Sequence, residues 1–235
     1  ESESLSEKRS NSIKKDISND LARADDRLGQ PKLIIISGGP CAGKTSVLKE
    51  LQKRNYFIVP EVATAIILEE YERLDRLYPQ FAPHHKITQI EDLQYKILKE
   101  QLSTYQKAVS KTSKNPPKKN LIIFDRSEVD TLVYASALLQ QETSASKDLS
   151  FFYEKANQTL KLYNTNVLFC EVIPVDHYNI TSNMVRYETY EQSISMGKKL
   201  REAYLNFGFT LHEIGYKKTI IEKANEVERL LHSFK

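Results

Sequence analysis

The fold of this chain is decided by residues 38–45, which read Gly38-Gly39-Pro40-Cys41-Ala42-Gly43-Lys44-Thr45. They fit the pattern G-x-x-x-x-G-K-[ST] at every fixed position. The preceding run Leu33-Ile34-Ile35-Ile36 has the length and branching of a buried strand, and a helix is expected from Lys44 to about Lys53. Because a strand and a helix enclose the pattern, we expect residues 38–45, the glycine loop, to bind phosphate.

Each part of the glycine loop has an expected role. Glycines let backbone N–H groups turn onto phosphate oxygens, and the following helix presents its positive end to the same anion. Lys44 is expected to reach the β- and γ-phosphates, the Thr45 hydroxyl to hold Mg²⁺, and Ser46 to touch the α-phosphate. The expected nucleotide-binding residues are therefore Gly38, Gly39, Pro40, Cys41, Ala42, Gly43, Lys44, Thr45 and Ser46. Cys41 is interpreted as a loop filler, and the alternative for the whole motif is a glycine turn with a solvated lysine.

Short β-branched runs alternate with helical periodicity from Pro31 onward, which is typical of repeated βα units and a parallel sheet. Four further strands are expected at 56–59, 121–124, 167–170 and 209–212. A long helix is expected over about 88–109, and surface breaks at 112–120 and 141–147. The sequence predicts one α/β domain over 31–235, a P-loop NTPase fold with a doubly wound parallel sheet in the order 2-3-1-4-5.

Composition narrows the class of protein. The chain has 235 residues, 40% hydrophobic and 28% charged, which suits one globular domain. Residues 1–30 are too polar to build a core, so a mobile or partly helical segment is expected there. No apolar run approaches the roughly 18–20 residues that span a bilayer, which favours a cytoplasmic protein without a transmembrane segment. A net charge of +3 gives no reason to expect nucleic acid, and Cys41 and Cys170 are expected to be free thiols.

An acidic residue follows the third expected strand. Asp125 stands at its carboxyl end, where open α/β sheets place their ligands, and is expected to bind Mg²⁺ directly or through water. A helix-cap role is the alternative, although Ser127 and Asp130 already form a capping-box-like pair. Two roles stay open for Arg126, which can contact a phosphate or the acceptor, or can be structural. Asp130 is a weaker candidate for the functional site.

Glu61 follows Pro60 at the end of the second expected strand, on the same ligand edge. A carboxylate here can accept the proton of an acceptor hydroxyl or orient the acceptor. The alternative is a glutamate in the first turn of a helix, where it interacts favourably with the helix dipole.

Basic residues gather after the fourth expected strand. Arg186 is the candidate for a lid that closes over transferring phosphoryl charge. Lys198, Lys199 and Arg201 follow on a helix and are interpreted as a solvated face. The pair His84-His85 has no partner at metal-ligand spacing and is interpreted as surface.

With these elements in order, the chain resembles the AAA-like P-loop domain family related to NadR-type ribosylnicotinamide kinases and, more distantly, the deoxynucleoside and thymidylate kinases. The resemblance covers about Lys32 to Leu231. It is carried by Ile36-Ser37-Gly38-Gly39-Pro40 with Gly43-Lys44-Thr45, Val59-Pro60-Glu61, Phe124-Asp125-Arg126 with Asp130, Arg186-Tyr187-Glu188-Thr189, and Lys217-Lys218. It implies a fold of nucleoside/nucleotide-kinase type.

Two positions depart from the pattern of this family. Thr64 stands where many bacterial relatives have Arg, closer to the eukaryotic-type branch that includes the nucleotide-binding domain of the TRPL-translocation-defect protein. Ser127 replaces the glycine usual after Asp-Arg and is similar to the Glu-Arg-Ser of deoxynucleoside kinases. The eukaryotic-type branch has no settled kinase substrate, so the resemblance implies either phosphoryl transfer or a switch or trafficking role.

Taken together, the motifs predict ATP-dependent phosphoryl transfer to a small, nucleoside-like hydroxyl acceptor. Lys44 and Arg186 are expected to balance γ-phosphate charge, Thr45 and Asp125 to hold Mg²⁺, and Glu61 to orient or deprotonate the acceptor. Two alternatives stay open, a nucleotide-dependent switch with a protein partner and a bare NTPase. GTP also stays open, although the missing Asn-Lys-x-Asp motif favours ATP.

Overall fold

The computed structural model describes residues 31–77, 90–139, 149–178 and 188–234. Its centre is a five-stranded sheet in the order β2-β3-β1-β4-β5, in which every neighbouring pair is parallel. The strands are β1 (Lys32–Gly38), β2 (Phe57–Val59), β3 (Leu121–Asp125), β4 (Asn166–Cys170) and β5 (Thr210–Ile214). The predicted fold class and strand order are confirmed.

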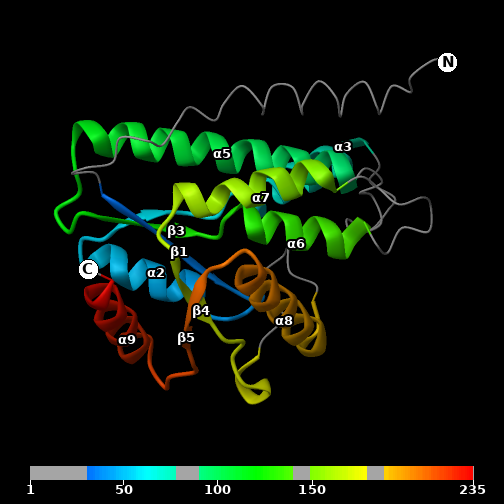
Figure 1. Ribbon diagram of the computed structural model, residues 1–235. Helices are drawn as coiled ribbons and strands as arrows, with labels where there is room; N and C mark the ends of the chain where they lie inside the picture. Colours follow the sequence, from blue (N-terminus) through cyan, green and yellow to red (C-terminus); the bar gives the residue numbers. More distant parts are fainter. Residues whose placement is uncertain (1–30, 78–89, 140–148, 179–187, 235) are drawn as a thin grey trace.

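Helices cover both faces of the sheet (Figure 1). On one face lie α5, α6 and α7, and on the other lie α2 and α9. The described helices are α2 (Lys44–Lys53), α3 (Ala63–Leu77), α5 (Ile90–Lys114), α6 (Glu128–Leu139), α7 (Ser150–Leu162), α8 (Tyr190–Asn206) and α9 (Ile220–Ser233), with the 3₁₀ turn η1 (Val175–His177).

Strand β1 shows why the sheet needs two helical layers. Successive side chains of a strand point to opposite faces, and those of β1 are apolar on both. Leu33 and Ile35 pack into the core beneath α5, α6 and α7, whereas Ile34 and Ile36 pack into the core shared with α2 and α9. The uninterrupted apolar run therefore predicts a central strand covered on both sides.

Some element boundaries differ from those expected. Helix α5 continues to Lys114, so Thr112, expected in a surface loop, is helical and buried. Its hydroxyl donates to the Ala108 carbonyl at 2.8 Å, which satisfies the polar group within the helix. The predicted segment 1–30, the break at 141–147 and the pair His84-His85 lie outside the described residues.

The strand register brings three chain segments to one edge of the sheet. Ile36 of β1 lies opposite Asp125 of β3, and Phe124 lies opposite Val59 of β2. Because the strands are parallel, the segments that follow β1, β2 and β3 leave the sheet on the same side. None of the described helices is long and apolar enough to cross a membrane.

Candidate functional site

The glycine loop (Gly38–Thr45) follows β1 and turns directly into α2. The Lys44 ammonium folds back over the loop and donates to the carbonyls of Gly38 at 2.9 Å and Gly39 at 3.0 Å. Lys44 is only 4% exposed. Burial lowers the pKa of Lys44 to about 8, and the nearby Arg126 charge adds to this effect. An anion in the loop would stabilise the charged form of this ammonium.

Helix α2 begins with free donors. Gly43 occupies its N-cap position at a φ of 72°, a conformation that glycine adopts readily, and no side chain caps the helix. The N-cap residue therefore offers no side-chain acceptor to the first-turn N–H groups, and Thr45 and Ser46 in this turn are exposed. This is the arrangement that binds a phosphate at a helix N-terminus.

Two glycines of the loop lie against neighbouring backbone. A Cβ atom at Gly38 would lie 2.1 Å from the Cys170 carbonyl oxygen. At Gly39 it would lie 2.8 Å from the Ser193 carbonyl oxygen of α8 and 2.9 Å from Cγ2 of Val172. The loop is thus closed in by β4 and α8, and neither position has room for a side chain.

Asp125 ends β3 beside the loop and is 9% exposed. Its Oδ1 atom is buried and accepts no hydrogen bond from the described residues. Burial raises the pKa of Asp125 to about 6, and the nearby Lys44 acts in the opposite direction. An unsatisfied carboxylate oxygen here is suited to a cation or to a water bound to one.

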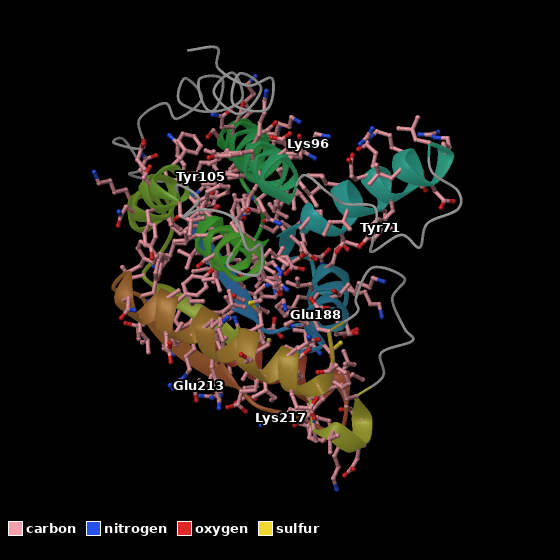
Figure 2. The ribbon with its side chains drawn as sticks, turned by 90° about the vertical axis from the view of Figure 1, so that its right-hand side faces the viewer. Tyr71, Lys96, Tyr105, Glu188, Glu213 and Lys217 are labelled. Atoms are coloured by element: carbon pink, nitrogen blue, oxygen red, sulfur yellow. The ribbon has the colours of Figure 1, made fainter. Side chains whose placement is uncertain are left out.

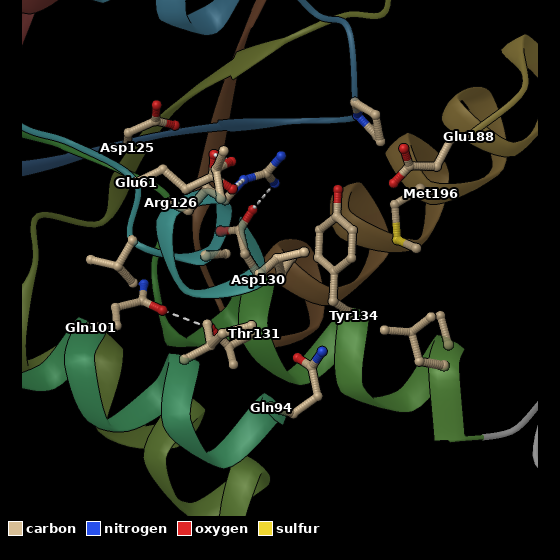
Figure 3. Close-up of a pocket in the computed structure, with 18 of the residues that line it drawn as sticks. Glu61, Gln94, Gln101, Asp125, Arg126, Asp130, Thr131, Tyr134, Glu188 and Met196 are labelled. Atoms are coloured by element: carbon tan, nitrogen blue, oxygen red, sulfur yellow. Dashed lines mark hydrogen bonds and ion pairs between the residues drawn. The ribbon is translucent and has the colours of Figure 1, made fainter. Parts of the chain in front are cut away.

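Arg126 is the most constrained side chain of the site. It has a φ of 77°, and its backbone N–H donates to the Ile36 carbonyl at 3.0 Å. Its guanidinium donates from Nε to Glu61 at 3.0 Å and from Nη1 to Asp130 at 2.9 Å, and lies 5.1 Å from the centre of the Tyr134 ring. Figure 3 shows it between the two carboxylates. The two carboxylates hold the guanidinium in place, and both roles left open by the sequence remain predictions.

Asp130 accepts hydrogen bonds from several segments of the site, a central role that its rank as a weaker candidate in the sequence did not predict. Its carboxylate accepts from the Ser37 hydroxyl at 2.6 Å, from the Ser127 N–H at 3.0 Å and from the Tyr204 hydroxyl, in addition to Arg126. Ser127 also caps α6 by accepting from the Val129 N–H at 3.2 Å, so the expected capping pair is present.

Glu61 lies between β2 and α3 and does not belong to the first turn of that helix, which begins at Ala63. Its Oε2 accepts from the Thr64 hydroxyl at 3.1 Å, and its Oε1 from Arg126. The interpretation as a first-turn glutamate does not hold, and the carboxylate is held at the ligand edge by its two partners.

A cavity of about 470 Å³ opens beside these residues. Pro40 of the glycine loop, Glu61, Asp125 and Arg126 form one wall of it. Most of the remaining lining comes from helices α3, α5, α6 and α8, and Glu188 adds to it just before α8. The polar side chains of this lining are Thr64, Tyr71, Gln94, Gln101, Thr104, Thr131, Tyr134, Glu188, Gln192, Ser195 and Lys199. Figure 2 shows Tyr71 and Glu188 on the same side of the molecule, although they come from different halves of the chain.

Sequence reasoning missed the polar lining from α5. Gln94 is 3% exposed, and Gln101 accepts from the Thr131 hydroxyl at 2.6 Å (Figure 3). The two glutamines are seven positions apart, on the helix face that also carries Ile97. Two amides on an otherwise apolar face were the signal that could have found them.

Only some of the site residues expected around α8 lie within the described residues. Arg186, the lid candidate, lies outside the described residues. Glu188 lines the cavity, and its Oε2 is buried with no hydrogen-bond partner among the described residues. Lys198, Lys199 and Arg201 are exposed as expected, although Lys199 also borders the cavity and Arg201 pairs with Glu213. Cys41 is partly exposed, and Cys170 is buried; both are free thiols.

Among solved structures, the chain is similar to deoxyadenosine kinase from M. mycoides. The form with bound dCTP shares 16% identity at a TM-score of 0.57, and the form with bound dATP shares 15% at 0.54. Each alignment covers 86% of this chain and 99% of the kinase. At this identity the likeness establishes the fold. A search of curated proteins finds no match.

A protein-family model matches most of the chain. The model described as "AAA domain" matches residues 33–223, a span that begins in β1 and ends in α9. It therefore includes the glycine loop, Glu61, Asp125 and the whole sheet apart from Lys32. The chain belongs to the AAA domain family of P-loop proteins.

Proposed function

We propose that this chain is a Mg²⁺-dependent, ATP-binding kinase that transfers the γ-phosphoryl group to a hydroxyl of a small, nucleoside-like acceptor. One observation carries the proposal: Pro40 of the glycine loop lines the same 470 Å³ cavity as Glu61 and Asp125. A phosphate held by the loop would therefore border a cavity that can hold an acceptor. Its volume lies within the range of about 300–1,000 Å³ that is usual for small-molecule sites.

On the nucleotide side, the glycine loop would bind the triphosphate. Lys44 would exchange its two carbonyl partners for β- and γ-phosphate oxygens, which are stronger acceptors for an ammonium. The uncapped N-terminus of α2 would add backbone donors, and the Ser46 hydroxyl would reach the α-phosphate. The absence of an Asn-Lys-x-Asp motif from the sequence supports ATP over GTP.

Asp125 and the Thr45 hydroxyl would hold Mg²⁺. The buried, unpartnered Oδ1 of Asp125 fits this role, because oxygen is the ligand that Mg²⁺ prefers. The described residues contain no group of three or more His, Cys, Asp or Glu that could hold a metal, so nucleotide oxygens and water would complete its coordination. The bound ion would neutralise charge on the phosphates.

On the acceptor side, Glu61 would act on the hydroxyl. The acceptor oxygen forms a bond to the γ-phosphorus as the bond to the β,γ-bridging oxygen breaks, ADP leaves, and Glu61 takes the hydroxyl proton. A carboxylate offers about four lone-pair sites, so Glu61 can accept this hydrogen bond beside those from Thr64 and Arg126. Arg186 would close over the transferring group.

The polar lining supports a nucleoside-like acceptor. Gln94 and Gln101 carry amides that both donate and accept, which suits the edge of a heterocyclic base. Glu188, on the opposite wall, has a buried oxygen that can accept from a sugar hydroxyl. Burial raises the pKa of Tyr134 to about 12, so its hydroxyl remains a donor at neutral pH.

The test is a screen of nucleosides and other small hydroxyl compounds for stimulated ADP release from Mg²⁺-ATP, with the phosphorylated product identified by mass spectrometry. The proposal expects at least one acceptor to raise ADP release well above the basal rate, and Lys44→Met to abolish it. Tight binding of ATP or GTP without stimulation by any acceptor would favour a switch with a protein partner. Basal hydrolysis that no acceptor changes would favour a bare NTPase.

A further inference from the structure

A second lysine reaches the glycine loop from the far end of the chain. Lys223 belongs to the first turns of α9 and is 4% exposed. Its Nζ donates to the Ala42 carbonyl at 2.8 Å, a buried contact across 181 positions of sequence. The same Nζ lies 3.7 Å from the point where a Cβ atom of Gly43 would stand. Figure 1 shows α9 beside α2, the helix that the loop enters.

The contact determines how one peptide unit of the loop faces. Ala42 and Gly43 share a planar trans peptide, in which the C=O and N–H bonds point in opposite directions. Because Lys223 draws the Ala42 carbonyl toward α9, the Gly43 N–H points away from α9. That N–H is one of the donors at the mouth of α2, and Gly43 has the left-handed backbone that such a turn requires.

The charge of Lys223 is also unmatched. Three lysines are buried among the described residues: Lys44, Lys155 and Lys223. Lys155 forms a salt bridge with Glu154, whereas Lys44 and Lys223 form none with any described carboxylate and donate only to loop carbonyls. A buried ammonium with neutral partners alone is costly. Two buried ammonium groups at one loop, neither of them in a salt bridge with a described carboxylate, favour an anion as the ligand of this site.

We propose that Lys223 is a positioning residue of the glycine loop. It holds the Ala42 carbonyl toward α9, orients the Gly43 N–H toward a bound triphosphate, and adds a positive charge behind the loop. The inference rests on the nucleotide-binding half of the proposed function and is independent of the acceptor. It assigns α9 a part in phosphate binding in addition to its packing.

The test compares binding of Mg²⁺-ATP and of inorganic triphosphate by isothermal titration calorimetry. Lys223→Met keeps the apolar stem and removes the ammonium, and Lys155→Met makes the same change at a buried lysine of α7 outside the site. We expect Lys223→Met to weaken both ligands by at least about tenfold, since hydrogen bonds to charged groups have effects of this size. Lys155→Met should change neither by more than about twofold. Lys223→Arg, which restores a cationic donor, should recover most of the loss.

Each result of this comparison either supports or overturns the inference about Lys223. Equal losses for the two methionine variants, or a Lys223→Met protein that binds triphosphate within about twofold of the wild type, would overturn the inference and leave the proposed function intact. Failure of the wild type itself to bind triphosphate would overturn both. Thermal unfolding without ligand shows whether each variant is folded. If Lys223→Met does not fold, Lys223→Gln takes its place. Glutamine also removes the charge, and its amide is too short to reach the Ala42 carbonyl from the same position. It should show the same loss, and near-normal binding would again contradict the inference.

Discussion

The Nε atom of Arg126 donates to Oε1 of Glu61 at 3.0 Å and joins two residues that are 65 positions apart in the sequence. The Arg126 side chain is buried and that of Glu61 is half-buried, with 8% and 18% of their surface exposed. The pair links the segment after β2 to the segment after β3 beside the cavity that both residues line. A change at either residue is therefore expected to alter the other.

Glu61→Gln should abolish most of the acceptor-dependent reaction. A general base typically contributes about 10²–10⁴-fold to the rate, so turnover with the identified acceptor should fall within that range. The dissociation constant of Mg²⁺-ATP should change by less than about threefold, because the glycine loop is intact. Steady-state ADP release and calorimetry measure the two effects. Glu70→Gln is the control on α3, since Glu70 pairs with Arg73 and Lys96 and does not line the cavity. Full turnover of Glu61→Gln would show that Glu61 is not the base.

Gln101→Leu should weaken acceptor binding selectively. It removes an amide from the cavity and leaves the Thr131 hydroxyl without its acceptor at 2.6 Å. We expect the KM for the acceptor to rise by about tenfold or more, since an acceptor group left unpaired on burial costs roughly 1–3 kcal/mol, while the KM for ATP stays within about twofold. Gln106→Leu, on the same helix but outside the cavity, is the matched control. Equal effects of the two substitutions on the acceptor KM would contradict this placement of the acceptor.

Gly39→Ala and Gly197→Ala should act in opposite directions, although the two glycines face each other. The new methyl group at Gly39 would stand 2.8 Å from a backbone oxygen, which should destabilise the fold by about 1–3 kcal/mol. At Gly197 of α8 the nearest atoms would be 3.7 Å and 3.9 Å away, an ordinary contact. Since alanine is favoured over glycine within a helix, Gly197→Ala should be neutral or stabilising by up to about 1 kcal/mol. Urea unfolding of both variants measures the difference, and equal destabilisation would contradict the geometry.

Glu128 should make stability depend on pH. It is 1% exposed at the start of α6 and accepts from the Thr159 hydroxyl at 3.2 Å. Burial raises the pKa of Glu128 from 4.5 to about 7. Between these values the unfolded chain loses its proton first, so this group lowers the free energy of unfolding as the pH rises through the window, and the loss is complete above pH 7.

Glu128→Gln has no proton to lose at this position. Its free energy of unfolding relative to the wild type should therefore rise by up to about 3 kcal/mol from acidic to mildly alkaline pH. Denaturant unfolding of both proteins at several pH values gives this difference, and its value below pH 4.5 reports the cost of the substitution itself. A difference that does not change with pH would contradict a raised pKa.

Much of the fold could be predicted because its signals are local. The β-branched runs before Gly38 and before Asp125 are short and strongly apolar, and parallel strands with helical connections follow from their spacing. The same logic placed Glu61 and Asp125 at one edge of the sheet, which the register confirms. The roles assigned to these two residues and to the glycine loop remain predictions.

The parts that escaped prediction depend on contacts between distant segments. Nothing near Arg126 in the sequence indicates that it pairs with Glu61. Nor does the sequence indicate that Asp130 accepts from β1 and α8 as well as from the residues just before its own helix. The periodicity of α5 did not single out Gln94, because a periodic pattern shows which face is buried and not what that face encloses. The sequence does not distinguish Lys223 from the other lysines, because its contact with Ala42 depends on the packing of α9 against α2.

The approach of α8 to Gly39 has a consequence for redesign. Main chain meets main chain there, and the same helix presents Gln192, Ser195 and Met196 to the cavity. Moving α8 to admit a bulkier compound would also displace the loop that is expected to grip the donor. Attempts to broaden substrate range should accordingly trim side chains on the helix and leave its axis where it is.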